Sequence, residues 1–208
     1  MIKYMSLGSD IVEKFEDYIN GILSKLDFID DKELKDSIYR LIYERNKLIE
    51  MINLDVLTDT YNRRILDSID KFSIVVICDI DDFKFINDSY GHMAGDKVLK
   101  VVSKVLKNNC NTEDVVCRYG GDEFLVIFKN CSISLAYEKI NNISHILNNY
   151  FKYSKINVSF SAGISCYEDG KSLEKAIKEA DVSLYEVKRN GKSGIGVYNN
   201  SDYKRLYK

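Results

Sequence analysis

The chain has 208 residues, is 45% hydrophobic and 30% charged, and carries a formal net charge of −2. These values predict one globular domain with an appendage and exclude the basic surface that nucleic-acid-binding proteins use. No apolar run approaches the about 20 residues that a membrane span requires, and the N-terminus lacks the apolar stretch of a signal peptide. We therefore expect a cytoplasmic protein with no membrane or nucleic-acid partner. Its five cysteines form no C-x-x-C pair, which predicts reduced thiols and no cysteine-bound metal.

Residues 1–54 are predicted to be helical. Apolar residues recur every three or four positions up to Leu26, which marks one face of a first helix. Asp30, followed three residues later by Glu33, forms a capping-box pattern and predicts the start of a second helix. A heptad rhythm, with Arg45 on its seam, follows at Leu34, Ile38, Leu41, Leu48 and Ile52. This seam fits a coiled coil with another copy or a helical hairpin within the chain, and so few heptads do not separate the two.

From residue 56 onward, predicted strands and helices are mixed. An apolar, β-branched run at residues 73–80 is typical of a buried central strand. The elements expected after it are a helix at 96–107, a hairpin around Gly120 and Gly121, a helix at 132–150, a strand at 156–165, a helix at 172–189 and a short strand at 194–198. The fold class is therefore α/β or α+β, with a mixed sheet covered by helices.

The most informative stretch is the expected hairpin turn. Gly120 and Gly121 are followed at once by Asp122 and Glu123, and apolar runs flank them on both sides. Glycine enters turn conformations with positive φ without a Cβ clash, and its small size leaves space for a large polyanion. The two acids at the mouth of the hairpin are suited to hold a hard cation beside that polyanion. An ordinary hairpin with a solvated acidic tip fits these residues equally well.

A second acidic site follows the buried strand. Asp79 directly abuts the apolar run, and a strand end beside the hairpin brings it near Asp122. Carboxylates without histidine suit Mg²⁺ or Mn²⁺ rather than zinc. For the two acids at 81 and 82, capping of the following helix is an equally good interpretation. Further on, Asn87 and Asp96 together offer the donors and acceptors that a guanine needs.

Four ordered segments together resemble the GGDEF family of diguanylate cyclases. Residues 55–64 resemble the family's D-x-L-T-G-L-x-N-R-R motif, and residues 79–96 match D-I-D-x-F-K-x-I-N-D-x-x-G-H-x-x-G-D. Residues 118–124 match the signature R-x-G-G-D-E-F, and residues 180–192 resemble A-D-x-A-L-Y-x-A-K-x-x-G-R. The resemblance covers about residues 55–200. It implies a cyclase domain at 55–200, which leaves residues 1–54, outside the resemblance, as an expected helical dimerisation or signalling segment and residues 201–208 as a tail.

The resemblance implies a ferredoxin-like or nucleotide-cyclase palm core. It implies that two GTP molecules are condensed into cyclic di-GMP, with release of two pyrophosphates, across a symmetric homodimer. The N-terminal helices would promote that dimer or bind a protein partner. The alternative is a catalytically weak domain that binds GTP or cyclic di-GMP as a signalling module. The input signal of residues 1–54 is not evident from the sequence.

The family's functional residues carry over to matching positions here. Two Mg²⁺ (or Mn²⁺) ions per active site would be held by Asp79, Asp122 and the Ile80 carbonyl. Glu123 would assist the metal site or the attacking hydroxyl. By the same resemblance, Gly120 and Gly121 would leave space for the phosphates, and Phe83 and Lys84 would contact the triphosphate. Asn87 and Asp96 would recognise guanine. Phosphate charge would be neutralised by Lys188, Lys192 and Arg118.

The chain departs from the family pattern at several positions. Asp59 and Thr60 replace the usual Gly and Leu, so local packing there is expected to differ. Lys192 replaces the usual Arg, which keeps the charge and loses bidentate phosphate geometry. The family's R-x-x-D product-binding motif has Asn111 in place of its Arg, although Asp114 is present. We therefore expect weak or absent inhibition by cyclic di-GMP through that site.

Overall fold

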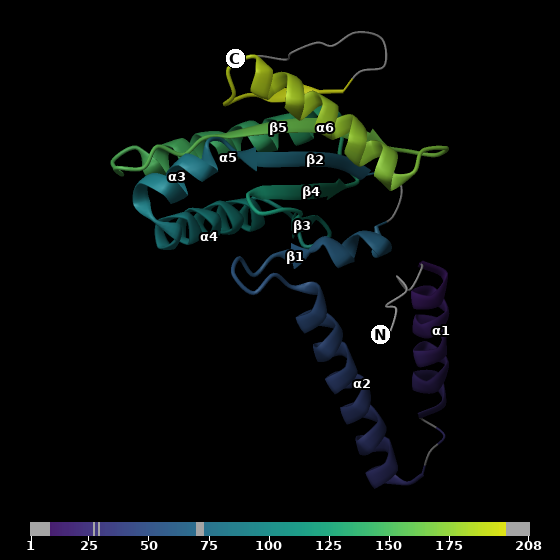
Figure 1. Cartoon of the computed structure of the whole chain (residues 1–208). Helices are drawn as coiled ribbons and strands as arrows, with labels where there is room; N and C mark the ends of the chain where they lie inside the picture. Colours follow the sequence, from purple (N-terminus) through teal and green to yellow (C-terminus); the bar gives the residue numbers. More distant parts are fainter. Residues whose placement is uncertain (1–8, 27, 29, 70–72, 199–208) are drawn as a thin grey trace, which may run out of the picture. The chain divides into compact units, whose positions relative to one another are not determined.

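The computed structural model describes residues 9–26, 28, 30–69 and 73–198 (Figure 1). The chain divides into two compact units, one formed by Met1–Leu54 with Arg64–Ser68 and the other by Asp55–Arg63 with Ile69–Lys208. The expected tail at 201–208 lies outside the described residues.

The first unit contains the helices α1 (Ser9–Leu26) and α2 (Lys32–Asn53). Asp31, not Asp30, caps α2, because its side chain accepts a hydrogen bond from the Leu34 backbone N–H at 3.1 Å. The predicted capping box was therefore one residue out of register. Asp31 has an extended backbone, which is typical of an N-cap residue.

The apolar seam of α2 is largely exposed. Leu34, Leu41 and Leu48, spaced seven residues apart, have exposed fractions of 50%, 66% and 58%. Ile38 and Ile42 are half-buried and lie on an adjacent face of the same helix. The leucine face thus has no cover among the described residues, and both alternatives for the seam stay open.

The second unit is built on one mixed sheet. Its described strands are β1 (Tyr61–Asn62), β2 (Ser73–Ile80), β3 (Val115–Arg118), β4 (Glu123–Lys129), β5 (Phe160–Tyr167) and β6 (Ile195–Val197). They lie in the order β1-β3-β4-β2-β5-β6, with β1–β3 and β5–β6 parallel and the other neighbours antiparallel. The central order β3-β4-β2-β5, with helices in both crossovers, is that of the ferredoxin-like fold. The predicted fold class is confirmed.

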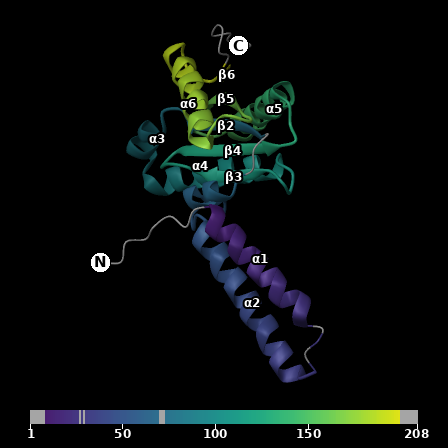
Figure 2. The ribbon, with the colours of Figure 1, turned by 90° about the vertical axis from the view of Figure 1, so that its right-hand side faces the viewer.

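Helices cover both faces of this sheet. They are α3 (Phe83–Tyr90), α4 (His92–Asn108), α5 (Ile133–Phe151) and α6 (Leu173–Arg189), and a 3₁₀ turn spans Arg63–Ser68. Figure 2 shows α5 and α6 on opposite sides of the strands, and α4 packs beside α5. Every residue of β2 is buried, as a central strand covered on both faces requires.

One strand boundary differs from the prediction. The strand expected at 156–165 begins at Phe160, because Phe160 pairs with Ile80, the last residue of β2. The residues before Phe160 therefore have no β2 residue to pair with. In the described part of the chain, no helix combines the length and the apolar character needed to cross a membrane.

Candidate active site

Three acidic residues occupy neighbouring backbone positions where β2 ends and β4 begins. Asp79 on β2 lies directly opposite Glu123 on β4, and Asp122 immediately precedes β4. The Ile80 N–H donates to the Asp122 carbonyl at 3.2 Å, which fixes the turn against the end of β2. The sheet register therefore brings together the acids that the sequence placed 43 and 44 positions apart.

This cluster raises the proton affinity of its own members. Burial raises the pKa of Asp79 above its usual 3.8, the negative charges of Asp122 and Asp81 raise it further, and Lys188 opposes these effects. Burial also raises the pKa of Glu123 above 4.5, and the charge of Asp79 adds to this effect. Concentrated negative charge of this kind is stabilised by a bound cation.

Lys188 supplies one positive charge to the cluster. Its Nζ lies 2.6 Å from Asp79 Oδ2, so that α6 is tied to the end of β2. Asp181, two turns earlier on α6, contributes negative charge near Glu123. Sequence reasoning did not assign Asp181 to the site, although its seven-residue spacing from Lys188 places both on one face of a helix.

The donor chemistry of the cluster fits a hard divalent ion. Asp79 and Asp122 offer only oxygen donors, with Glu123 beside them and the Ile80 backbone between them, as Mg²⁺ and Mn²⁺ prefer. Among the residues described, no three acidic, histidine or cysteine side chains converge on a point that would hold an ion. Asp79 is instead bonded to Lys188, so an ion that binds Asp79 Oδ2 must displace the ammonium.

The two glycines of the turn act differently from the prediction. Neither Gly120 nor Gly121 has positive φ, so the expected left-handed turn geometry was wrong. A Cβ on Gly120 would lie 2.6 Å from Glu123 Oε2, so a side chain at this position would displace the end of the Glu123 carboxylate. A Cβ on Gly121 would meet open space. The turn is thus open beside Gly121 and filled by an acid beside Gly120.

Arg118 fixes the same turn. Its Nη2 and Nε donate to the Gly121 carbonyl at 2.7 and 3.1 Å, and its Nη1 lies 3.2 Å from Asp55 Oδ1. Asp55 also accepts hydrogen bonds from Thr58 through the backbone N–H at 2.9 Å and the hydroxyl at 2.6 Å. Sequence reasoning missed this role of Asp55, although Asp55 opens the first of the four motifs.

Cationic groups gather at the start of α3. Lys192 Nζ bonds Asp82 Oδ1 at 2.6 Å, and this hydrogen bond raises the pKa of Lys192 above 10.5. Asp82 is the N-cap residue of α3, where it adopts the left-handed conformation. Phe83 and Lys84 form the first turn of this helix, and Lys84 is exposed. A helix N-terminus with lysines beside it is suited to bind phosphate groups.

The two residues proposed to read guanine lie on neighbouring helices, Asn87 on α3 and Asp96 on α4. The side chain of Asn87, on α3, occupies the space that a Cβ on Gly95 would need. Asp96 is the next residue on α4 and is exposed. The glycine thus allows the Asn87 side chain on α3 to lie against the backbone of α4.

The departures from the family pattern have local explanations. Asp59 has φ 53°, a conformation that glycine adopts more easily, and its carboxylate is bonded by Lys107 Nζ at 2.6 Å. Thr60 is buried and satisfies its hydroxyl with that of Thr58 at 2.9 Å. Local packing at these two positions is therefore polar.

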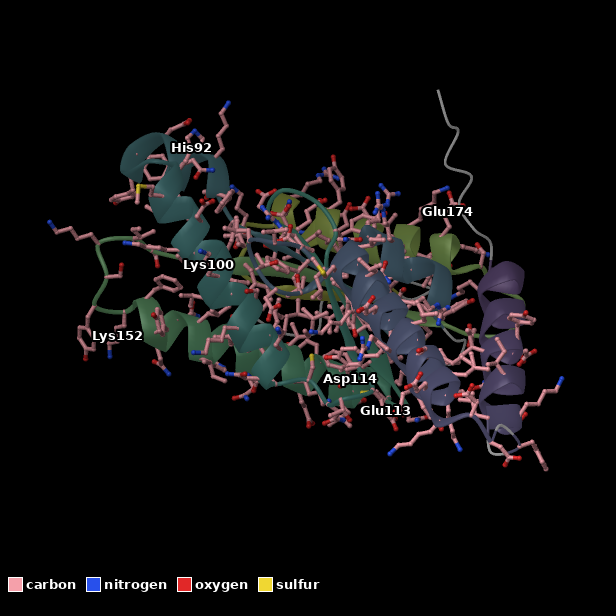
Figure 3. All side chains as sticks on the ribbon, turned by 90° about the horizontal axis from the view of Figure 1, so that it is seen from below. His92, Lys100, Glu113, Asp114, Lys152 and Glu174 are labelled. Carbon is pink, nitrogen blue, oxygen red and sulfur yellow. The ribbon has the colours of Figure 1, made fainter. Side chains whose placement is uncertain are left out.

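Asp114 is bonded entirely within the protein. Its Oδ2 accepts from the Asn111 N–H at 2.8 Å, its Oδ1 accepts from the Lys129 N–H at 3.0 Å, and Lys139 Nζ lies 3.3 Å from Oδ2. Only 1% of the Asp114 side chain is exposed. Figure 3 shows α4 running from His92 past Lys100 toward this residue. The carboxylate closes the turn between α4 and β3.

A ferredoxin-like sheet with an acidic cluster at two strand ends, and lysines beside it, is a framework suited to bind phosphates together with metal ions. The family described as "Diguanylate cyclase, GGDEF domain" matches residues 52–194. The chain belongs to this family.

Individual relatives agree with this membership. Diguanylate cyclase A of Treponema denticola is 31% identical over 222 residues, which cover 97% of this chain and 57% of that protein. Diguanylate cyclase DosC of Escherichia coli strain K12 is 31% identical over 186 residues, which cover 80% of this chain and 40% of that protein. The chain thus spans about half the length of these curated relatives.

A solved structure shows the same fold. The coiled coil and GGDEF domain of DgcB from Caulobacter crescentus, in complex with c-di-GMP, superposes with a TM-score of 0.69 at 24% sequence identity. The match covers 79% of this chain and 95% of that one.

Proposed function

We propose that residues 55–200 form a diguanylate cyclase domain that condenses two GTP molecules into cyclic di-GMP and releases two pyrophosphates. The observation that carries this proposal is the pairing of Asp79 with Glu123 across β2 and β4, with Asp122 beside them and Lys188 Nζ 2.6 Å from Asp79. Family membership and relatives that are named diguanylate cyclases support the same activity.

Each group of side chains has a task in this reaction. Asp79 and Asp122 would hold two Mg²⁺ or Mn²⁺ ions with help from the Ile80 carbonyl, and ions held there would supply neutralisation of phosphate charge and activation of the 3′-hydroxyl. Glu123, whose pKa is raised by burial and by Asp79, is suited to accept a proton from that hydroxyl.

The surrounding residues bind and orient the nucleotide. Gly121 leaves open space at the turn, and the first turn of α3, which contains Phe83 and Lys84, faces the phosphates. Lys188 and Lys192 balance the phosphate charge after they leave Asp79 and Asp82, while Asn87 and Asp96 bind the guanine edge. Arg118 keeps the turn in place through its bonds to the Gly121 carbonyl, and any contact of Arg118 with phosphate is additional.

The reaction requires two copies of the domain. Each bound nucleotide must present its 3′-hydroxyl to the α-phosphate of the other, so a symmetric dimer belongs to the mechanism. The exposed leucine face of α2 supports a role of residues 1–54 in raising the local concentration of one domain near another. The same helices are the place where a protein partner would act.

One assay tests the proposal. The full chain is incubated with GTP and Mg²⁺ and the nucleotides are separated by chromatography, with Asp122→Asn as the inactive variant. Asp36→Asn, an exposed carboxylate on α2, is the matched control. Product from the wild type and the control only is the expected result. GTP retention without product supports a binding module instead, and absence of both rejects the proposal.

A further inference from the structure

Asp81 is a buried acid that lies beside the proposed catalytic acids and serves a different purpose. It is 6% exposed and follows β2 directly. Its Oδ1 accepts from Ser161 Oγ at 2.7 Å, and its Oδ2 accepts from Ser159 Oγ at 2.8 Å and from the Ser193 N–H at 3.0 Å. Both carboxylate oxygens are thus bonded within the protein, which separates Asp81 from the metal-binding role proposed for Asp79.

The most distant of these bonds reaches the turn after α6. Ser193 follows Lys192, and both residues are in the left-handed region, with φ of 49° and 60°. Residues with a side chain rarely adopt this conformation, so two in succession persist only where the surroundings hold them. Asp81 and Ser161 are the side chains that do so: the Ser193 N–H also lies 3.1 Å from Ser161 Oγ.

Packing does not hold this turn on the side of α5. Ser193 and Gly194 border a hollow of about 300 Å³ that is lined from α5 by Tyr137, Asn141, Ser144 and His145. The remaining anchors are backbone bonds, from the Lys192 N–H to the Val187 carbonyl at 3.1 Å and from Ala162 to the Gly194 carbonyl at 2.9 Å. The conformation of the turn therefore depends on hydrogen bonds, and the Asp81 carboxylate supplies a charged one.

The turn determines where Lys192 points. Lys192 Nζ reaches Asp82, the N-cap residue of α3, from 110 positions away in the sequence. Asp81 and Asp82 are neighbours, so one holds the backbone of the turn while the other receives its lysine. The ammonium is thereby placed beside the helix start at which the nucleotide phosphates are proposed to lie.

We propose that Asp81 is a positioning residue for the cyclase reaction. By fixing the Ser193 backbone, Asp81 orients the Lys192 side chain toward the triphosphate of GTP. Without the Asp81 carboxylate, Lys192 keeps its charge, but its ammonium is no longer held in this position. This inference rests on the proposed function, because it takes GTP as the substrate. It assigns Asp81 to orientation of the phosphate end and not to ion binding or recognition of the base.

Asp81→Asn tests the proposal selectively. In either orientation of its amide, the Asn side chain lacks the negative charge and offers one oxygen acceptor in place of the two that now accept from Ser161, Ser159 and Ser193. Ser159→Ala is the matched control, since it removes a donor to Asp81 and leaves both acceptors of the Ser193 N–H in place. Affinity is measured by calorimetry with the full chain, Mg²⁺ and a GTP analogue that carries a methylene group between its α and β phosphorus atoms. GMP, which lacks the outer phosphates, is titrated in parallel.

We expect Asp81→Asn to weaken binding of the analogue about tenfold, as loss of one aimed charge contact would. The affinity of Asp81→Asn for GMP should stay within about twofold of the wild-type value. The affinities of Ser159→Ala for the analogue and for GMP should also stay within about twofold of the wild-type values. In a Lys192→Met background, Asp81→Asn should have no further effect, because both changes remove the same contact.

Other results overturn the inference. One is that the losses of analogue affinity from Asp81→Asn and Lys192→Met add up in the double variant. The other is that Asp81→Asn weakens GMP binding as much as it weakens binding of the analogue, which would indicate general disruption of the site. Should Asp81→Asn not melt cooperatively, Ser161→Ala takes its place, with an expected loss of about threefold that disappears in the Lys192→Met background. If the wild type binds the analogue but forms no product from GTP, the proposed function is refuted. The role of Asp81 in binding the triphosphate is then still decided by the affinities of the variants. A wild type that binds no analogue refutes both.

Discussion

Arg118 and Asp55 form an ion pair, Nη1 to Oδ1 at 3.2 Å, across 63 positions of the sequence. Asp55 follows Leu54, the C-cap residue of α2, and Arg118 also holds the Gly121 carbonyl of the signature turn. The first residue after the helical segment is therefore bonded directly to the residue that fixes the proposed catalytic turn.

Asp55→Asn is expected to lower the free energy of unfolding by about 1 kcal/mol at neutral pH, since the pair is partly exposed. Burial acts to raise the pKa of Asp55, but hydrogen bonds from Thr58 and the charge of Arg118 outweigh it, and the pKa lies below 3.8. A carboxyl with a lowered folded-state pKa stabilises the fold above its unfolded value and loses this contribution as the pH falls through the folded value.

Urea unfolding of the wild type and Asp55→Asn at a series of pH values measures this effect. The difference in unfolding free energy between the two proteins should be constant above about pH 5 and shrink as the pH falls below 3.8. A difference that does not change with pH would show that Asp55 contributes through packing rather than through its charge. Asp36→Asn, an exposed acid on α2, is the control.

Lys188→Met is expected to raise the pKa of Asp79 further in the metal-free protein. Burial already raises this pKa, and the ammonium 2.6 Å from Oδ2 is the group that opposes the increase. Carbon-13 NMR of the aspartate carboxyl groups follows the titration. Lys178→Met, which removes an exposed lysine paired with Glu174 on the same helix, should leave the Asp79 midpoint unchanged. An unchanged midpoint in Lys188→Met would refute the electrostatic role of Lys188.

Local pattern was sufficient to predict the central strand and the hairpin. The apolar, β-branched run at 73–80 gave the bounds of β2 to the residue, and Ser132 and Ser172 proved to be the N-cap residues of α5 and α6. These features are determined by residues only a few positions apart in the sequence, so hydrophobic periodicity and the residue types typical of helix N-caps indicate them.

The polar framework of the site was not accessible in this way. The bonds from Asp81 to Ser161 and Ser193 span 80 and 112 positions, and nothing in the local pattern of either segment identifies the partner. The glycine at 120 was explained by turn conformation, whereas the structure gives it no positive φ and places the end of Glu123 beside it. Sequence reasoning found the acids from their places at a strand end and a hairpin turn, with the resemblance in agreement, and it missed Asp55 and Asp81, which bond the neighbouring turns.

Asp114→Ala is expected to destabilise the protein rather than relieve product inhibition. The buried carboxylate accepts from the backbone N–H groups of Asn111 and Lys129, and its removal leaves these donors unsatisfied at a cost of about 2 kcal/mol. Chemical unfolding measures the loss, and Glu113→Ala, the exposed neighbour that Figure 3 labels, is the control.

The same residue allows a test of product inhibition. With Asn111 in place of an arginine and Asp114 only 1% exposed, cyclic di-GMP at about 1 µM should not slow GTP turnover in the wild type. Initial rates across a range of added product settle this point. An inhibition constant below about 1 µM that Asp114→Ala abolishes would contradict it.

The leucine face of α2 provides the last prediction. Leu41→Glu combined with Leu48→Glu places charge on two residues that are 66% and 58% exposed, so the fold of a single copy should tolerate the change. If this face joins two copies, repulsion between the introduced carboxylates lowers the local concentration of one cyclase domain near the other. Turnover per mole of chain should then fall about tenfold or more in dilute solution and recover as the protein is concentrated.

Tyr43→Glu is the matched control, because Tyr43 is 60% exposed on the opposite face of α2. It should retain the concentration dependence of the wild type in both turnover and sedimentation. If the leucine variant also keeps that dependence, the two copies meet through another surface, and the dimerisation role of residues 1–54 is wrong. If the leucine variant stays fully active but no longer responds to a cellular partner, the face serves that partner instead.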